Sequence, residues 1–244
     1  MAQEGLRFTE GEMLGEVVKL DRLRDKPYSM VICYPRYGLD ELEGRLQEMR
    51  MLGVEAVEFS GDRFVLNVPV LGKGCVGVVV AAYSGKGKVA LKIRRTDADR
   101  ESMNREAEML RLANSICVGP RLLKVTDNIL MMEFVEGVLL LNWINNLEGD
   151  SLLVKKRVCR VLKEILHQCR RLDRIGLDHG ELSQASKHIL IGPNDEVHII
   201  DFETASTNRK SSNVTSICQF LFVGGGLAKA ITKIVGGIRR EELI

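Results

Sequence analysis

The chain has 244 residues, of which 45% are apolar and 28% are charged, and its formal net charge is +2 at pH 7. This length is enough for one large domain or two small ones, and the apolar content supports a full hydrophobic core. A basic balance this mild does not by itself indicate a nucleic-acid-binding protein.

The cysteines and the apolar runs bear on where the protein is expected to work. Its six cysteines are scattered without a close pair, so the spacing indicates neither a zinc site nor a disulfide framework. The first residues lack a signal-peptide core. The sequence also lacks the run of about 20 apolar residues that a membrane span requires. We therefore expect a cytoplasmic protein without a membrane span.

Residues 1–66 are predicted to form a small, separate β-rich module with one helix. The expected strands cover 15–20, 28–34, 54–59 and 64–68. The helix is indicated by apolar residues at spacings of three and four, namely Leu39, Leu42, Leu46 and Met49. The module contains no histidine and a single cysteine. We expect it to pack or to present a substrate rather than to do chemistry.

A glycine-rich stretch follows, in which Gly72, Gly74 and Gly77 fit the pattern Gly-x-Gly-x-x-Gly. In a dinucleotide-binding domain this pattern opens a helix. Here it leads into the strand-forming run 78–80 and then a turn at 84–87, which predicts a hairpin. Glycines in such a hairpin let backbone amides approach phosphates, because no Cβ stands in the way.

The next strand, 88–95, carries Val89-Ala-Leu-Lys92, which resembles the third strand of protein kinases and its phosphate-binding lysine. The alternative is an exposed edge position, because alternation puts Lys88, Ala90 and Lys92 on one face. A helix is expected over 97–112. Its apolar stripe contains Glu106, which resembles the kinase glutamate that pairs with this lysine, whereas Glu108 belongs to a solvated face.

Strands are predicted over 122–125 and 128–132, and the second leads into Met132-Glu-Phe-Val135. This run resembles the hinge between kinase lobes, with Met132 behind the adenine pocket and the backbones of Glu133 and Val135 facing adenine. The alternative is a plain core strand.

A short helix is expected over 139–146 and a long one over 151–174. The long helix has a clear apolar stripe on one side. Its remaining surface is basic, with Lys155, Lys156, Arg157, Arg160, Arg170, Arg171 and Arg174. A solvated face is one interpretation, and contact with phosphates is the other.

Two apolar runs, 189–191 and 197–200, flank Gly-Pro-Asn-Asp and predict a β-hairpin. Glu181 precedes it, and Asp201 follows its second strand directly. A carboxylate at the end of a buried strand is costly unless a charge such as a metal ion lies against it. The alternative is an ordinary hairpin with two solvated acids. A segment rich in serine and threonine follows over 204–213, and helices are expected over 214–222 and 227–235.

In this order the motifs resemble a protein kinase over residues 67 to about 222. The implied fold is α+β and bilobal, with a β-rich N-lobe over 67–134 and a small, mainly helical C-lobe over 135–244. The short segment after Glu203 and the words His179-Gly-Glu and Asp201-Phe-Glu resemble the compact atypical families, such as the RIO and KEOPS-associated kinases.

The variant His-Gly-Glu-Leu-Ser, with Lys-His-Ile-Leu-Ile and Ile-Asp-Phe-Glu, is similar to an archaeal family of RNA kinases that phosphorylate a ribose 2′-hydroxyl in tRNA. The resemblance implies ATP and Mg²⁺ as cofactors and tRNA as the partner. The implied nucleotide-binding residues are Gly72, Lys73, Gly74, Gly77, Val79, Ala90, Lys92, Glu106, Met132, Glu133, Val135, Leu190 and Ile200. The implied RNA-binding residues are Arg170, Arg171, Arg174, Arg209 and Lys210.

The sequence departs from the kinase pattern at two places. Glu181 stands where the catalytic Asp is usual, and it is expected to accept the hydroxyl proton. The metal-binding Asn is replaced by either Ser186 or His188, beside the metal carboxylate of Asp201, and Mg²⁺ prefers oxygen ligands. Lys187 is expected to neutralise the transferring phosphate. The alternatives to an RNA kinase are a RIO-type Ser/Thr protein kinase and a nucleotide-binding pseudokinase module.

Overall fold

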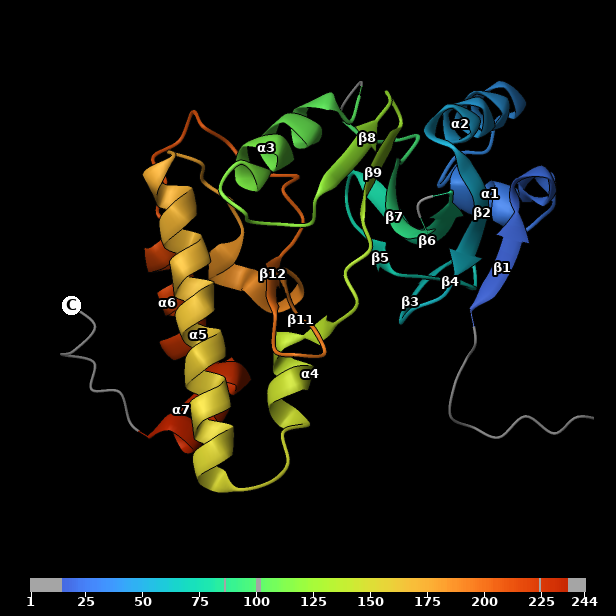
Figure 1. The fold of residues 1–244 in the computed structure, drawn as a ribbon. Helices are drawn as coiled ribbons and strands as arrows, with labels where there is room; N and C mark the ends of the chain where they lie inside the picture. Colours follow the sequence, from blue (N-terminus) through green and yellow to red (C-terminus); the bar gives the residue numbers. More distant parts are fainter. Residues whose placement is uncertain (1–14, 86, 100–101, 224, 237–244) are drawn as a thin grey trace, which may run out of the picture. The chain divides into compact units, whose positions relative to one another are not determined.

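The computed structural model describes residues 15–85, 87–99, 102–223 and 225–236 (Figure 1). The chain divides into two compact units. The first contains the residues up to Met103 together with Lys124–Met131, and the second contains Asn104–Leu123 and the residues from Met132 onward. We describe each unit by itself.

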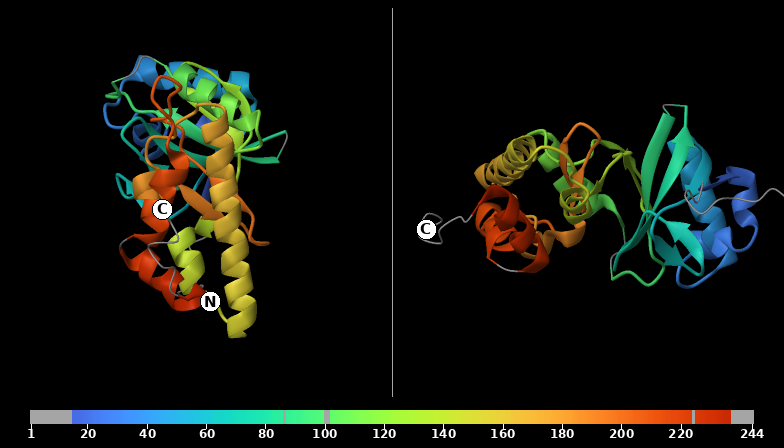
Figure 2. Two further views of the ribbon diagram at one scale, coloured as in Figure 1. Left: turned by 90° about the vertical axis from the view of Figure 1, so that its left-hand side faces the viewer. Right: turned by 90° about the horizontal axis from the view of Figure 1, so that it is seen from below.

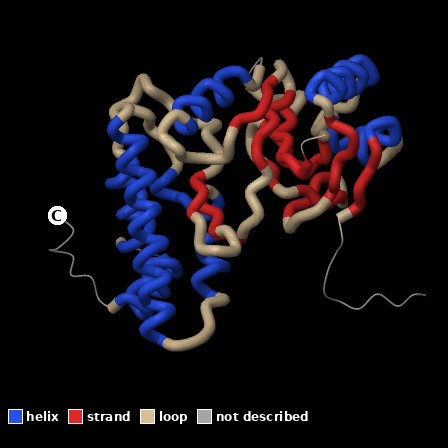
Figure 3. Tube along the Cα trace, in the orientation of Figure 1, coloured by secondary structure: helices blue, strands red, loops and turns tan. Residues whose placement is uncertain are grey.

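The first unit is built on one large sheet, whose strands are drawn in red in Figure 3. The strand order is β1-β2-β6-β7-β9-β8, with β5 paired to β6. The bounds are β1 (Glu16–Lys19), β2 (Val54–Phe59), β5 (Gly72–Lys73), β6 (Gly77–Ser84), β7 (Gly87–Arg94), β8 (Leu122–Val125) and β9 (Ile129–Glu133). A separate two-stranded hairpin consists of β3 (Arg63–Val65) and β4 (Val68–Val70).

Helix α2 (Leu39–Leu52) packs against β2 and supplies much of the apolar core of this part. It ends at Gly53, whose φ of +82° suits a glycine after a helix. Its buried Arg45 is held by the carbonyl of Ile32 at 2.6 Å and by the carboxylate of Glu41. A buried guanidinium is tolerable only with such partners, so Arg45 joins α2 to the preceding helix.

The predicted strand 28–34 is wrong. Residues Tyr28–Ile32 form a short helix, α1, after a 3₁₀ turn over Leu20–Arg24. Pro27 precedes the helix, and the fixed φ of proline is compatible with a helix start. Tyr28 stacks on Phe59 with ring centroids 5.0 Å apart. Apolar, β-prone residues can form a helix when tertiary packing decides, because propensity is a weak prior.

The expectation of a separate N-terminal module is wrong in one respect. Strand β2 pairs with β1 on one side and with β6 on the other, and both pairings are antiparallel. Val57 lies opposite both Val18 and Ala82 in these pairings. The glycine-rich hairpin and the N-terminal strands therefore share one sheet and one core. The physical reason is that an unpaired edge of β6 would leave its backbone groups exposed.

The second unit is mainly helical. Its helices are α3 (Asn104–Asn114), α4 (Leu140–Asn145), α5 (Ser151–Arg174), α6 (Asn213–Phe222) and α7 (Gly225–Val235). A three-stranded sheet of β10 (Val138–Leu139), β11 (Ile189–Ile191) and β12 (Val197–Ile199) completes it. Helices α6 and α7 lie alongside the long α5, as Figure 2 shows. Asp150 caps α5 by accepting bonds from the amides of Leu152 and Leu153.

The architecture confirms an α+β fold with a β-rich first part and a helical second part. The helix expected from Asp97 begins later, at Asn104, and residues 100–101 lie outside the described residues. Among the described helices, none is long and apolar enough to cross a membrane alone. Helices α6 and α7 meet that length and composition only together, with a bend of 76° between them.

The sharing of one core makes a prediction for β2. Val57 is fully buried and its neighbour Glu55 is exposed on the same strand. We expect Val57→Asp to destabilise the first unit by about 3 kcal/mol or more, because it buries an unpaired charge. Hydrogen exchange at the amides of β6 should then become faster. The control Glu55→Ala should leave that exchange unchanged, and unchanged exchange in Val57→Asp would contradict the shared core.

Candidate functional site

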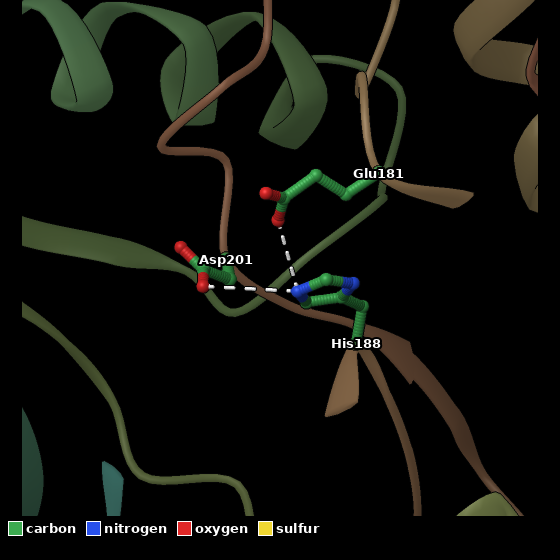
Figure 4. A group of neighbouring side chains, drawn as sticks. All are labelled: Glu181, His188 and Asp201. Atoms are coloured by element: carbon green, nitrogen blue, oxygen red, sulfur yellow. Dashed lines mark ion pairs between the residues drawn. The ribbon is translucent and has the colours of Figure 1, made fainter. Parts of the chain in front are cut away.

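Three functional side chains converge in the second unit: Glu181, His188 and Asp201 (Figure 4). The Nε2 of His188 lies 3.0 Å from Oε2 of Glu181 and 3.9 Å from Oδ2 of Asp201. One ligand atom from each residue lies within 4.8 Å of the others. The imidazole is buried, whereas both carboxylates are partly exposed. The structure therefore brings His188 together with Glu181 and Asp201, the two acids that the sequence singled out.

The β11–β12 hairpin positions two of these side chains. His188 directly precedes β11, and Asp201 comes two residues after β12. The amide of Ile200 donates to the carbonyl of His188 at 2.9 Å, which closes the open end of the hairpin. At the turn, Asp195 adopts a φ of +65°. This hairpin matches the expected ranges.

Asp195 fixes the turn of the hairpin to two helices. Its carboxylate accepts bonds from Arg157 at 2.8 Å and Arg160 at 2.7 Å on α5, and from the indole of Trp143 on α4. The bond from Arg157 is the main reason that the pKa of Asp195 is lowered. Arg157 and Arg160 thus bond to Asp195 within the protein. We therefore leave them out of the basic surface of α5 that could contact phosphates.

Asp201 has a backbone that few residues adopt. Its φ of +68° lies in the left-handed region, where aspartate is tolerated better than most side chains. Such conformations persist only where the surroundings hold them, and they concentrate at functional sites. The next residue, Phe202, is buried, and its ring lies 5.1 Å from that of His179. Phe202 and Leu110 of α3 also lie against Gly119, where a Cβ would come within 2.8 Å of the phenyl ring.

His179 is a buried core residue of the loop 177–182, which we call the catalytic loop after the kinase segment that it resembles. Its Nε2 lies 3.1 Å from the carbonyl of Ile200, and its ring centroid lies 5.5 Å from that of His188. Burial, followed by the neighbouring His188, lowers the pKa of His179 to about 4. The imidazole is therefore neutral near pH 7, and it packs between the carbonyl of Ile200 and the ring of His188.

Asn213, at the start of α6, holds the catalytic loop through hydrogen bonds to its backbone. This buried amide accepts a bond from the backbone N–H of His179 at 2.9 Å. It donates to the carbonyl of Leu177 at 2.7 Å and to the carboxylate of Asp173 at 2.8 Å. Asp173 also accepts from the amides of Asn213 and Val214, which satisfies the first turn of α6. Sequence reasoning missed both residues.

The segment after Phe202 is fastened to the catalytic loop. Asp178 and Ser206 exchange two backbone hydrogen bonds, of 2.9 and 2.8 Å. The hydroxyl of Thr204 donates to the carbonyl of His179 at 2.9 Å. Arg209 donates to the carboxylate of Asp178 at 2.9 Å and to the carbonyl of Thr204 at 2.6 Å. The segment is thus short and held in one arrangement.

Gly180 stands where protein kinases carry the arginine of their His-Arg-Asp motif. Its φ is +90°, and a Cβ there would lie 2.6 Å from Nη2 of Arg209 and 2.8 Å from Oγ1 of Thr204. Both the backbone and the space therefore require glycine. The guanidinium of Arg209 occupies the space beside it, so the role that we predicted for Arg209 in RNA binding competes with an intramolecular one.

In the first unit, the predicted phosphate-binding residues form a row across the sheet. Gly72 pairs with Val79, and Val79 pairs with Lys92. Ala81 pairs with Ala90 in the same register, so Val79, Ala90 and Lys92 share one face. The glycine-rich stretch forms a hairpin of two strands, as expected, and not the start of a helix.

Lys92 is only 3% exposed, so the alternative of an exposed edge lysine is wrong. A Cβ on Gly77 would lie 2.9 Å from Cγ of Lys92, which shows that the glycine makes room for the lysine stem. In the second unit, Glu106 is also 3% exposed and Glu108 is exposed, as the helical stripe predicted. The charged side chains of Lys92 and Glu106 are thus both buried, and buried charges are retained where they are paired or functional.

The remaining predicted residues are spread over both units. In the hinge, the amide of Glu133 donates to the carbonyl of Arg121 at 2.9 Å, so an adenine contact there would have to use its carbonyl. Met132, Val135, Leu190 and Ile200 are half-buried. Lys73, Ser186 and Lys187 are exposed. On α5, Arg170 and Arg174 are exposed, whereas Arg171 forms an ion pair with Glu164 at 3.2 Å.

The donor set at the cluster suits a hard cation through its oxygens. Mg²⁺ is bound through one or two carboxylates and substrate phosphates, and Asp201 and Glu181 supply such carboxylates. A cation between these two carboxylates would be attracted by both. His188, as a nitrogen donor, is the weaker ligand for Mg²⁺, and its Nε2 already holds Glu181.

Two comparisons with known proteins gave matches to this chain. The model of the RIO domain matches residues 80–216. An uncharacterised protein of Methanocaldococcus jannaschii is 35% identical over 100 residues, which are 41% of this chain and 79% of that protein.

The anchor made by Asn213 can be tested directly. We expect Asn213→Ala to destabilise the second unit by about 2 kcal/mol, because it leaves the buried N–H of His179 and the carbonyl of Leu177 without their partner. Hydrogen exchange at His179 should accelerate more than exchange in α5. The control is Gln219→Ala on the exposed side of α6, which should alter neither quantity. Protection at His179 that survives Asn213→Ala would show that another group holds the loop.

Proposed function

Because the chain belongs to the RIO-domain family of atypical kinases, we propose that it transfers the γ-phosphate of ATP to a ribose 2′-hydroxyl of RNA, and that tRNA is the substrate. The family implies an ATP-dependent kinase. The choice of RNA over protein is the proposal. We also propose that the protein works in the cytoplasm.

The observation that carries a phosphotransferase function is the cluster of Glu181, His188 and Asp201 beside a locked catalytic loop. When bound, ATP with Mg²⁺ supplies the phosphoryl group and neutralises its charge. Asp201, with its carboxylate held at a left-handed backbone position, is the metal-holding residue. Lys92 and the backbone of 72–77 are the groups that hold the phosphates.

Glu181 is the residue that positions the acceptor hydroxyl and takes its proton. One of its oxygens is bonded to Nε2 of His188 at 3.0 Å, which fixes the orientation of the carboxylate. The carboxylate is partly exposed, so an incoming hydroxyl can reach it. A carboxylate fixed in this way fulfils the role that the kinase fold gives to its catalytic acid, in which positioning does most of the work.

The segment between Phe202 and α6 favours RNA as the acceptor. In this chain it is short and fastened by Asp178, Thr204 and Arg209. It offers little material for a groove that docks an extended peptide. The exposed cations Arg170, Arg174 and Lys210 in the same unit are suited to phosphate contacts. These features support a structured, polyanionic substrate.

The deciding experiment supplies ATP labelled at the γ-phosphate to the purified protein, with tRNA, with total protein, or with neither. Label in tRNA that is stable to phosphatases specific for terminal phosphates, and that maps to an internal ribose, is the expected result. Label in protein with none in tRNA would replace the proposal with a RIO-type protein kinase. Nucleotide binding without transfer to any acceptor would point to a pseudokinase module.

Two substitutions separate metal binding from proton transfer. Asp201→Asn should abolish transfer while the fold survives, because it removes the metal-holding carboxylate. Glu181→Gln should leave ATP binding nearly intact and lower turnover on the order of a hundredfold or more, as loss of a general base does. Turnover by single-turnover kinetics and nucleotide binding by calorimetry would check both. Wild-type turnover in Glu181→Gln would exclude this residue as the base.

The proposed RNA contact predicts a dependence on salt. tRNA affinity should fall steeply as salt rises, and the variants Arg170→Ala, Arg174→Ala and Lys210→Ala should each lower the log–log slope by roughly one. Affinity for ATP should stay the same. Lys19→Ala, at an exposed lysine of β1, is the charge-matched control and should keep the full slope. Binding that is indifferent to salt would count against phosphate contacts.

A further inference from the structure

We infer that Tyr34, in the turn between α1 and α2, is a positioning residue for the glycine-rich hairpin. Lys73 belongs to β5, and its Nζ lies 4.4 Å from the centroid of the Tyr34 ring. The guanidinium carbon of Arg95, just after β7, lies 5.1 Å from the same centroid. One aromatic ring therefore contacts a cation next to the tip of the hairpin and another just after β7, and all three residues belong to the first unit.

Arg95 also forms hydrogen bonds to the backbone of the glycine-rich hairpin. Its Nη1 donates to the carbonyl of Gly74 at 3.1 Å, and its own amide donates to the carbonyl of Val76 at 2.7 Å. The amide of Gly74 donates in turn to the carbonyl of Gly77 at 2.8 Å. Arg95 thus bonds to two residues at the tip of the hairpin, Gly74 and Val76, and Tyr34 is the ring against which that arginine lies.

The turn that carries Tyr34 is itself fastened to the end of β7. The amide of Thr96 donates to the carbonyl of Tyr34 at 2.9 Å, and the amide of Arg36 donates to the hydroxyl of Thr96 at 3.0 Å. Asp97 forms an ion pair with Arg95 at 2.7 Å, which fixes the guanidinium from its other side. Because these bonds hold both the turn of Tyr34 and the guanidinium of Arg95, the ring forms a rigid support for the arginine.

This support matters because glycine backbones are flexible. Glycine loses more conformational freedom on ordering than any other residue, so a glycine-rich hairpin needs outside contacts to keep its amides aimed at phosphates. Tyr34 and Lys73 both precede the range that matches the RIO domain. The N-terminal residues thus act on the nucleotide, and this inference rests on the proposed function as a kinase.

The variants Tyr34→Ala and Tyr34→Phe test the inference. Tyr34→Ala removes the ring, whereas Tyr34→Phe keeps its face for both cations. Tyr37→Ala is the matched control, because Tyr37 is an exposed aromatic residue of the same turn. In the protein without nucleotide, Tyr34→Ala should accelerate hydrogen exchange at residues 73–77. Tyr34→Phe and Tyr37→Ala should retain the protection of the wild type.

The kinetic readout should divide in the same way. Loss of two cation–aromatic contacts predicts a rise of about tenfold in the KM for ATP with Tyr34→Ala, with kcat nearly unchanged, and Tyr34→Phe should restore the KM. Where Tyr34→Ala fails to fold, Tyr34→Leu, which removes the aromatic face and keeps an apolar side chain, gives the same comparison. Wild-type exchange at 73–77 in Tyr34→Ala, or a KM that Tyr34→Phe does not restore, would overturn the inference. Absence of ATP turnover in the wild type would instead sink the proposed function, and the exchange data would still decide on Tyr34.

Discussion

Two carboxylates of the second unit, Glu181 and Asp201, share one imidazole, that of His188. Each lies beside one imidazole nitrogen, and that imidazole is buried. Like charges at such separations are unfavourable unless a donor or a cation lies between them. His188 supplies the donor in the protein alone, and a bound cation would supply the charge. The β11–β12 hairpin, the catalytic loop and helices α5 and α6 hold these three groups together.

Rigidity at the cluster comes from neutral groups behind it. His179 stays uncharged because burial lowers its pKa to about 4. Its ring therefore packs beside the carbonyl of Ile200 and the ring of Phe202 without adding a charge. Asn213 satisfies the loop that carries His179, and Asp173 satisfies Asn213. Both the oxygen and the nitrogen of the buried Asn213 amide have partners, which a buried polar group requires. The charged groups can then face solvent and substrate while the supporting layer stays fixed.

Local pattern predicted the elements that carry the chemistry. The apolar stripe over α5, the hairpin around its Gly-Pro-Asn-Asp turn and the burial of Glu106 follow from residue spacing, whereas the burial of Lys92 follows only from its resemblance to the kinase lysine. The failures lie where distant residues decide. Tyr28–Ile32 forms a helix because Phe59 and the core around it accept that packing.

The anchor between Asp173 and Asn213 could not be read from spacing either, since their separation in sequence is 40 residues. A signal for it was present. Asn213 follows a run of serines and opens an apolar helix, where polar residues commonly satisfy the first turn. The division at residue 66 failed for a related reason. Strand pairing between β2 and β6 is a long-range contact, and the sequence of each strand is compatible with either a separate module or a shared sheet.

Glu181, one departure from the usual kinase motif, interacts with His188, one of the two residues proposed in place of the kinase asparagine. Glutamate at position 181 reaches one methylene farther than aspartate. In the structure, the longer acid meets the ring at 3.0 Å between Oε2 and Nε2. An aspartate at 181 would fall short of this nitrogen. An asparagine at 188 would leave the glutamate without its ring partner. The contact between Glu181 and His188 therefore fixes the orientation of this carboxylate, which a shorter acid at the same position would not allow.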